Sequence, residues 1–198
     1  MPTSPNGASL VQTVSASWSR LYKNGVGEAR TRQGRKSSTR FLIVDAQSVK
    51  NTDSAGEKIS GIKHHIAVDT QGLPHAIAVT TAEVTDRKGT LLALGRCAVN
   101  LQAVQRILAD GGYVGQPFAQ AVEELLGAQV QIAKCTELHT FAVMPQRWVV
   151  ERSFAWIEKF RRLWKNCERK LNTSLQFIHL AFLSCVFRGI VTGDFAEE

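Results

Sequence analysis

The chain has 198 residues, of which 44% are hydrophobic and 21% charged, so it can form one globular domain and lacks the composition of a disordered or fibrous protein. Its formal net charge of +7 favours a polyanionic partner, nucleic acid first among them, although a basic soluble protein without such a partner would carry the same charge. The most apolar stretch, residues 175–191, contains Gln176, His179 and Arg188 and is short for a bilayer, which argues against a membrane span.

The cysteines indicate a reducing compartment. They show no Cys-x-x-Cys spacing and no histidine at zinc-ligand spacing. We therefore expect reduced thiols in a cytoplasmic protein. The first ten residues, MPTSPNGASL, lack the basic-then-apolar order of a signal peptide, which agrees with that expectation.

Residues 1–40 predict a basic, partly flexible N-terminal arm. A short helix is expected around residues 11–25, and residues 20–40 are dense in Arg and Lys. From residue 41 the pattern changes to that of a folded domain, which we predict over residues 41–198.

Predicted strands and helices alternate through this domain. FLIVD is a short apolar run typical of a buried strand, and KHHIAVDTQGLPHAIAVT indicates two strands around a turn that contains Asp69. Asp86 is the expected cap of the next helix, and Thr173 or Ser174 that of the last one. The other elements are a strand over 104–110, a helix over 117–126, a strand over 128–134 and a long helix from about residue 147. This order predicts an α/β fold with a mixed sheet.

Two aspartates close predicted strands. Asp45 ends FLIVD, and Asp110 ends RILAD directly before Gly111 and Gly112. Sites in open α/β sheets collect at the carboxyl ends of strands, so neighbouring strands would bring the two carboxylates together. The glycines would let a bulky group such as a sugar-phosphate backbone approach. For either aspartate alone, a turn residue at the end of a strand is the other interpretation.

Glu151 lies in PQRWVVERSF, where a helix would place it at the margin of an apolar stripe. The residues of the stripe recur at spacings of three and four: Val150, Phe154, Ile157, Phe160 and Trp164. A helix packed by this stripe would direct Glu151 along the boundary of the core. The alternative is a surface pair with Arg147, one turn earlier, which would contribute only about 0.3–0.5 kcal/mol.

Three carboxylates from separate segments suit a metal site. Mg²⁺ prefers oxygen ligands and keeps waters or substrate phosphates in its shell. Two such ions can hold the attacking and leaving oxygens of a phosphoryl transfer. Clustered acids repel one another, and a bound metal removes that repulsion. Asp45, Asp110 and Glu151 are therefore the predicted metal ligands and catalytic residues, with surrounding Lys and Arg on the nucleic-acid backbone.

Five motifs carry a resemblance to a known family: FLIVDAQSVK, GIKHHIAVDTQGLPHAIAV, DRKG, ILADGGYVG and RWVVERSFAWIEKFRRLWKNCER. Over about residues 41–190 the chain resembles the catalytic domain of DDE transposases of the insertion sequence five group, within the broader IS-four-like transposases. The resemblance implies a ribonuclease H-like fold with a mixed five-stranded sheet flanked by helices. It also implies two Mg²⁺ ions, which Mn²⁺ can replace. The implied substrate is double-stranded DNA, cut at element ends and joined to target DNA by a homodimer at the nucleoid.

The family's site residues can be carried over one by one. Its two aspartates fall on Asp45 and Asp110, and its glutamate falls on Glu151. Its arginine ahead of that glutamate falls on Arg147, where the implied role is to grip a DNA phosphate or to orient the glutamate.

The sequence departs from the broader family at two positions. Met144 stands where a tyrosine is frequent, and Glu158 stands where a lysine is frequent. Lys159, next to Glu158, is the candidate replacement for that lysine. The other cations expected to bind DNA are Arg152, Lys50 and Lys63.

Alternatives to an active transposase remain open. Relatives carry a longer helical region ahead of the domain, which helps to bind the terminal repeats. A truncated relic that binds DNA or a partner subunit without catalysis is one alternative, and another nuclease of the same fold is a second. His64 and His65 are adjacent in a predicted strand and so point to opposite faces, which disfavours a shared metal.

Overall fold

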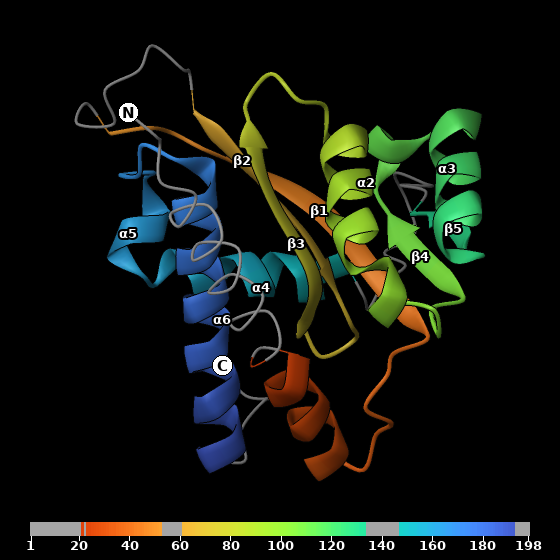
Figure 1. The fold of residues 1–198 in the computed structure, drawn as a ribbon, viewed down its shortest axis with the longest axis horizontal. Coiled ribbons are helices and arrows are strands. Elements are labelled where there is room, and N and C mark those ends of the chain that lie inside the picture. The colour runs from red at the N-terminus through yellow and green to blue at the C-terminus, as the bar shows by residue number, and fades with distance from the viewer. Residues whose placement is uncertain (1–20, 22, 53–60, 134–146, 193–198) are drawn as a thin grey trace, which may run out of the picture.

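The structure of the chain is a computed structural model, which describes residue 21 and residues 23–52, 61–133 and 147–192 (Figure 1). Its strands are β1 (Phe41–Val49), β2 (Ile62–Val68), β3 (Pro74–Thr81), β4 (Arg106–Ala109) and β5 (Gln129–Ile132). Its α-helices after β3 are α2 (Asp86–Cys97), α3 (Gln116–Leu126), α4 (Arg147–Glu158), α5 (Arg161–Trp164) and α6 (Leu171–Thr192). The short 3-10 helices η2 (Ala98–Asn100) and η3 (Gly111–Tyr113) precede and follow β4.

The five strands form one mixed sheet in the order β3-β2-β1-β4-β5. β1 pairs antiparallel with β2, and β2 pairs antiparallel with β3. β4 and β5 continue the sheet on the other side, parallel to β1. The predicted mixed five-stranded sheet is confirmed, and its arrangement around a central β1 is that of the ribonuclease H-like fold.

Helices cover both faces of the sheet. Neighbouring residues of a strand point to opposite faces, so the apolar residues of one strand contribute to two cores. In β1, Ile43 packs in one core with residues of α4 and α6, whereas Leu42 and Val44 pack in a second core with residues of α2 and α3. Figure 1 shows β3 between α6 and α2, and α3 beside β5. The position of a β1 residue along the strand therefore decides whether it faces α4 or α2.

Residues 23–32 form a helix, called here the N-terminal helix, that packs against the domain. Val26 and Ala29 are buried in the same core as α6. Arg30 is 6% exposed and pairs with Asp69 in the turn between β2 and β3. This part of the predicted arm is thus fixed to the domain by buried contacts. Residues 1–20 lie outside the described residues, and the domain boundary at residue 40 stays a prediction.

Two predicted helix caps were wrong. Thr85, not Asp86, caps α2 through its side-chain oxygen. Asp86 is the first helical residue, where the positive end of the helix dipole stabilises its negative charge. α6 begins at Leu171, so Thr173 and Ser174 lie inside its first turn.

The long helix predicted from residue 147 is shorter than expected. α4 ends at Glu158, and the chain turns into α5 with Phe160 as the residue before that helix. Trp164 is 61% exposed and does not belong to the apolar stripe. The residues of the stripe that α4 buries are Val150, Phe154 and Ile157.

Two further features agree with the sequence. In the described ranges, no helix combines the length and apolarity that crossing a bilayer requires. Cys97, Cys167 and Cys185 are free thiols, and Cys135 lies outside the described residues.

Candidate active site

Asp45 and Asp110 lie on neighbouring parallel segments. The register of β1 and β4 pairs Ile43 with Leu108. Because the strands are parallel, Asp45 and Asp110, each two residues further on, lie beside each other. Ile43 and Leu108 are both buried in the core that α4 and α6 share. Side chains two residues apart in an extended chain share a face, and the backbone at Asp110 is still extended. Both carboxylates therefore face the α4 side of the sheet.

The two aspartates line one small cavity together with α4. Its volume is about 10 Å³, and its walls include Val150 of α4 and Ala133 after β5. Asp45 and Asp110 are each half-buried. The structure thus brings two of the three predicted acids together at this place.

Backbone hydrogen bonds orient both carboxylates. Asp45 Oδ1 accepts the Ala46 N–H at 2.8 Å, and Asp110 Oδ1 accepts the Gly112 N–H at 2.9 Å. A side chain at Gly112 would bring its Cβ to 3.1 Å from the same oxygen of Asp110. Arg87 of α2 holds this segment by donating to the Gly112 carbonyl at 2.9 Å. Gly112 therefore contributes to the orientation of Asp110 itself.

Tyr113 packs in the core that α2 and α3 share, where negative charge from nearby acids still acts on it. Its phenol is buried, with the oxygen 3.2 Å from Thr90 Oγ1. Burial raises the pKa of Tyr113, and nearby negative charge raises it further. That charge comes from Asp45, Asp86 and Asp110. The phenol therefore stays protonated at neutral pH, and a cation bound among these acids would be stabilised by the same charge.

Glu151 is carried into this region by α4. It directly follows Val150, which lines the cavity, and its side chain is exposed. Within the described ranges, no group of three or more His, Cys, Asp or Glu side chains could hold a metal ion, so Glu151 does not complete such a cluster with Asp45 and Asp110. The donor set still suits Mg²⁺. Two carboxylates facing one cavity offer oxygen ligands, and Mg²⁺ uses one or two protein carboxylates with waters and phosphates in the rest of its shell.

A hydrogen bond ties the far end of α4 to β1. Gln47 Nε2 donates to Glu158 Oε1 at 2.6 Å. Gln47 lies two residues after Asp45 on the same face of β1, and Glu158 lies about 10 Å, or two turns, after Glu151 on α4. The contact helps to fix how α4 lies along β1 beside the cavity.

Arg152 already has contacts within the protein. Its guanidinium carbon lies 4.5 Å from the ring centroid of Trp148 and 5.1 Å from that of Trp156. It also donates to the Gln71 carbonyl at 2.9 Å, and burial lowers its pKa. These contacts join α4 to the turn between β2 and β3, so a DNA-binding role for Arg152 stays a prediction.

The other predicted DNA-binding cations differ in their surroundings. Lys63 Nζ lies 2.9 Å from Asp86 Oδ1 and is partly buried. Lys50 and Lys159 are exposed. Arg147 is the first residue of α4, and its side chain lies outside the described parts.

A comparison with protein families decides what kind of domain this is. The family model described as the transposase DDE domain matches residues 36–187, more than half of the chain. The chain belongs to this family. A Burkholderia cepacia protein, named as a transposase for insertion sequence element IS402, is 35% identical to this DDE domain over 130 residues. The match covers 62% of this chain and 59% of that protein, so the chain spans less than two thirds of this relative.

The fold of this DDE domain recurs in a chain of known structure. A chain of the simian T-cell lymphotropic virus intasome in complex with PP2A regulatory subunit B56 gamma aligns with a TM-score of 0.51 and 15% identity, over 74% of this chain and 48% of that one. The catalytic core domain of BIV integrase aligns with a TM-score of 0.48 and 9% identity, over 79% of this chain and 99% of that one. The likeness to the intasome chain supports the ribonuclease H-like fold and nothing beyond it.

Two contributors to the site were missed in the sequence. Tyr113 is visible in ILADGGYVG, but no pattern there shows that its ring is buried beside Thr90. The bond between Gln47 and Glu158 joins residues 111 positions apart, which no local spacing reveals. In the sequence, Glu158 is visible only as a departure from the lysine frequent in relatives.

Proposed function

We propose that the protein is a DDE-type transposase that uses Asp45, Asp110 and Glu151 to cut DNA at the ends of an insertion element. The freed 3′-hydroxyl is then joined to target DNA. The observation that carries this proposal is the cavity shared by Asp45 and Asp110, which α4 closes at Val150. Membership of the transposase DDE domain family supports it independently.

Each acid has its own structural support. Asp45 comes from the middle of β1 and Asp110 from the end of β4, and backbone hydrogen bonds orient both. Glu151 comes from α4, whose position along β1 is held by Gln47 and Glu158. Asp45, Asp110 and Glu151 would hold Mg²⁺, as two ions that Mn²⁺ could replace, and the metal would supply Lewis-acid stabilisation of a transferring phosphoryl group. The three carboxylates are the proposed ligands.

Double-stranded DNA is the proposed substrate, both at element ends and at the target. The formal net charge of +7 supports a polyanionic partner. A homodimer that pairs two element ends is the proposed assembly, acting in the cytoplasm at the nucleoid. The proposed DNA-binding cations are Arg147, Arg152, Lys159, Lys50 and Lys63.

A nicking assay on duplex DNA that contains the element ends tests this function. We expect nicking by the wild type with Mg²⁺ and none with EDTA. Asp110→Asn keeps the shape of the side chain and removes its charge, so it should lower the rate by more than the about 10–100-fold that loss of an outer partner costs at a metal site. Glu123→Gln, on the exposed face of α3, is the matched control and should nick like the wild type.

Three outcomes separate the candidates. Nicking that persists in EDTA, or that Asp110→Asn leaves unchanged, would contradict the proposed function. DNA binding by the wild type without any cleavage would support the alternative of a transposase relic that holds DNA or a partner subunit. Cleavage without strand-transfer products would support another nuclease of the same fold.

A further inference from the structure

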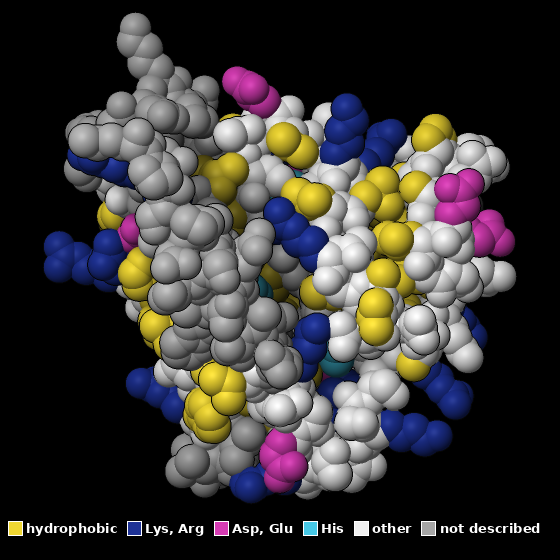
Figure 2. Space-filling view, in the orientation of Figure 1, with side chains coloured by type: hydrophobic (Ala, Val, Ile, Leu, Met, Phe, Trp, Pro, Cys, Tyr) yellow, Lys and Arg dark blue, Asp and Glu magenta, His cyan; other side chains and the backbone are white. Residues whose placement is uncertain are grey.

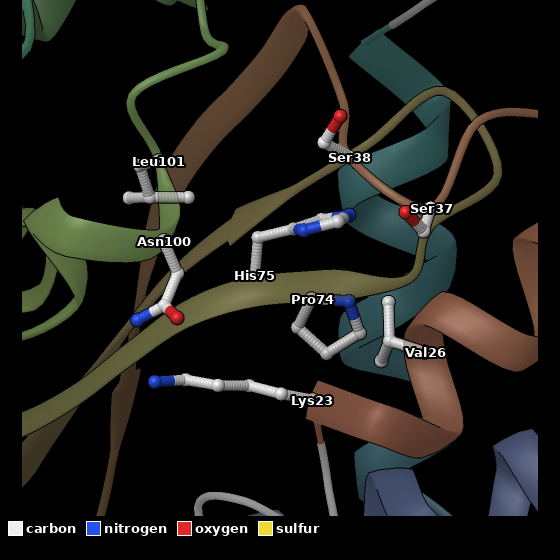
Figure 3. A pocket seen from close by; sticks show the side chains of 8 residues that line it. All are labelled: Lys23, Val26, Ser37, Ser38, Pro74, His75, Asn100 and Leu101. Carbon is white, nitrogen blue, oxygen red and sulfur yellow. The ribbon is translucent and has the colours of Figure 1, made fainter.

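A second, larger pocket lies at the end of the sheet where β1 and β4 begin. It has a volume of about 170 Å³ and is walled by the N-terminal helix, the segment before β1, the start of β3 and the end of η2. Figure 3 shows Lys23 and Asn100 at one end of this pocket and Ser37 and Ser38 at the other, with His75 between them. An ammonium, an amide and two hydroxyl groups thus border one space.

The pocket is positively charged. No Asp or Glu is among the residues that line it in the described part of the chain, and Lys23 contributes an ammonium. Arg96, in the last turn of α2, adds a second charge nearby. Both charges act on Cys97, where they oppose the burial that raises the pKa of that thiol. Glu28, an acid of the N-terminal helix, is paired with Arg32 at 2.9 Å.

Further Arg and Lys side chains lie at the same end of the sheet. Arg40 precedes β1 and Arg106 begins β4, and the Arg40 carbonyl accepts the Arg106 N–H at 3.2 Å. Arg35 and Lys36 lie on the segment that enters β1, and all four side chains are exposed. Figure 2 shows Lys and Arg side chains projecting at the lower right of the molecule, below the start of β1.

A buried ion pair holds this basic segment in place. Arg30 donates to the Lys36 carbonyl at 2.9 Å and to the Ser38 carbonyl at 3.5 Å. Its charge is matched by Asp69, which is fully buried and also lies 3.2 Å from His75 Nε2. The backbone that carries Ser37 and Ser38 is therefore held in place, which lowers the ordering cost of binding on this side of the pocket.

We propose that this pocket binds a phosphate of the DNA backbone and that Arg40 and Arg106 contact neighbouring phosphates. The inference rests on the proposed action on DNA. A polyanion fits better than a single small phosphate because exposed arginines continue beyond the pocket. The phosphate held here is separate from the phosphodiester that is cut, since the four steps from Phe41 to Asp45 span about 13 Å along β1.

Binding of the full chain to a duplex that lacks element ends, followed by fluorescence anisotropy over a range of salt concentrations, tests this site. Lys23→Gln removes one proposed contact, and Lys23→Gln with Arg40→Gln removes two. Each lost contact should lower the slope of log affinity against log salt by about 0.9 and weaken binding several-fold. Arg32→Gln is the matched control, because it removes one charge from the same helix at a side chain already paired with Glu28.

Equal affinity and salt slope in Lys23→Gln, the double variant and Arg32→Gln would overturn the inference. Thermal unfolding with inorganic phosphate separates the sources of the anion. If phosphate stabilises the wild type but not Lys23→Gln, while DNA binding is equal in both, the pocket takes free phosphate and the DNA assignment is wrong. Cleavage is a separate readout. If the variants bind DNA more weakly but the wild type does not cut it, the proposed function is wrong and this site stands. If the wild type cuts DNA but the variants bind it as the wild type does, this site is wrong and the proposed function stands.

Discussion

His64 lies in the middle of β2, where it is 1% exposed, and neither ring nitrogen has a hydrogen-bond partner within the described residues. Burial lowers its pKa to about 4, with a smaller effect from His65 in the same direction. The ring is therefore neutral at pH 7 and packs as part of the core. His65 faces the other side of the sheet and lies 2.9 Å from Thr80 Oγ1, as the alternation of a strand requires.

This burial predicts a stability that depends on pH. Because the folded pKa of His64 is about 4 and its ordinary value is 6.5, the unfolded chain binds the proton first as pH falls. The stabilisation is complete above pH 6.5 and is lost progressively towards pH 4, by about 3 kcal/mol at most from this residue. Urea unfolding of the wild type and His64→Leu across this range measures it. The variant should lose less stability than the wild type, and an equal loss would show that His64 does not carry the effect.

The buried ion pair of Asp69 is a feature that local sequence patterns do not reveal. The sequence indicates a turn residue, and Asp69 does lie at the turn between β2 and β3, but it is fully buried. Burial acts to raise its pKa, but His75, Arg30 and the backbone N–H of Gln71 together lower it below its ordinary value. Arg30 is 39 residues away, so no spacing in the sequence marks the pair.

Asp110 could be predicted, because it directly follows β4 and the carboxyl end of a strand has a known place in the sheet. The expectation that Asp45 ends its strand was wrong, because pairing with β2 continues β1 to Val49 and leaves Asp45 in the middle of the strand.

At the scale of elements, α2 packs closely on β2 at one glycine. A Cβ at Gly89 would lie 2.1 Å from the His65 ring. Gly95 lies in the same helix, and no described atom comes within 4 Å of the place that its Cβ would take. The two positions therefore separate the cost of close packing from the cost of glycine in a helix.

The same substitution should have opposite effects at these positions. Gly89→Ala forces a methyl group into the His65 ring and should lower the free energy of unfolding by about 1–3 kcal/mol. Gly95→Ala improves helix propensity in open space and should raise that free energy by about 0.5–1 kcal/mol. Urea unfolding at pH 7 measures both, and changes of the same sign would contradict this packing of α2.

The strands were easier to predict than the helix ends. Runs such as FLIVD carry their own apolar pattern, and the order of strands and helices fixes the mixed sheet. The end of α4 was not visible, because the apolar spacing continues through Phe160 and Trp164. What ends the helix is the turn into α5, which buries Leu163 and leaves Trp164 exposed. That turn depends on contacts with other elements, which a local spacing does not contain.

Across the whole molecule, opposite charges collect at different places on the sheet. Acids meet beside α4, where β4 ends, and cations gather where β1 and β4 begin. The motifs predicted the first of these, because each acid lies in a distinctive segment. They did not predict the second, because its pocket joins the N-terminal helix, β3 and η2 through tertiary packing. Under the proposed function, the basic pocket would hold DNA at one place and the acids would cut it at another.

The central proposal is that Asp45 and Asp110 hold a divalent metal, with Glu151 as a third ligand. Binding of Mn²⁺ to the full chain with a duplex present, followed by electron paramagnetic resonance, measures this directly. We predict saturable binding by the wild type and by Glu123→Gln. Asp45→Asn and Asp110→Asn should each weaken it by at least about tenfold, since loss of even an outer partner costs about that much. Equal Mn²⁺ affinity in all four proteins would contradict the claim.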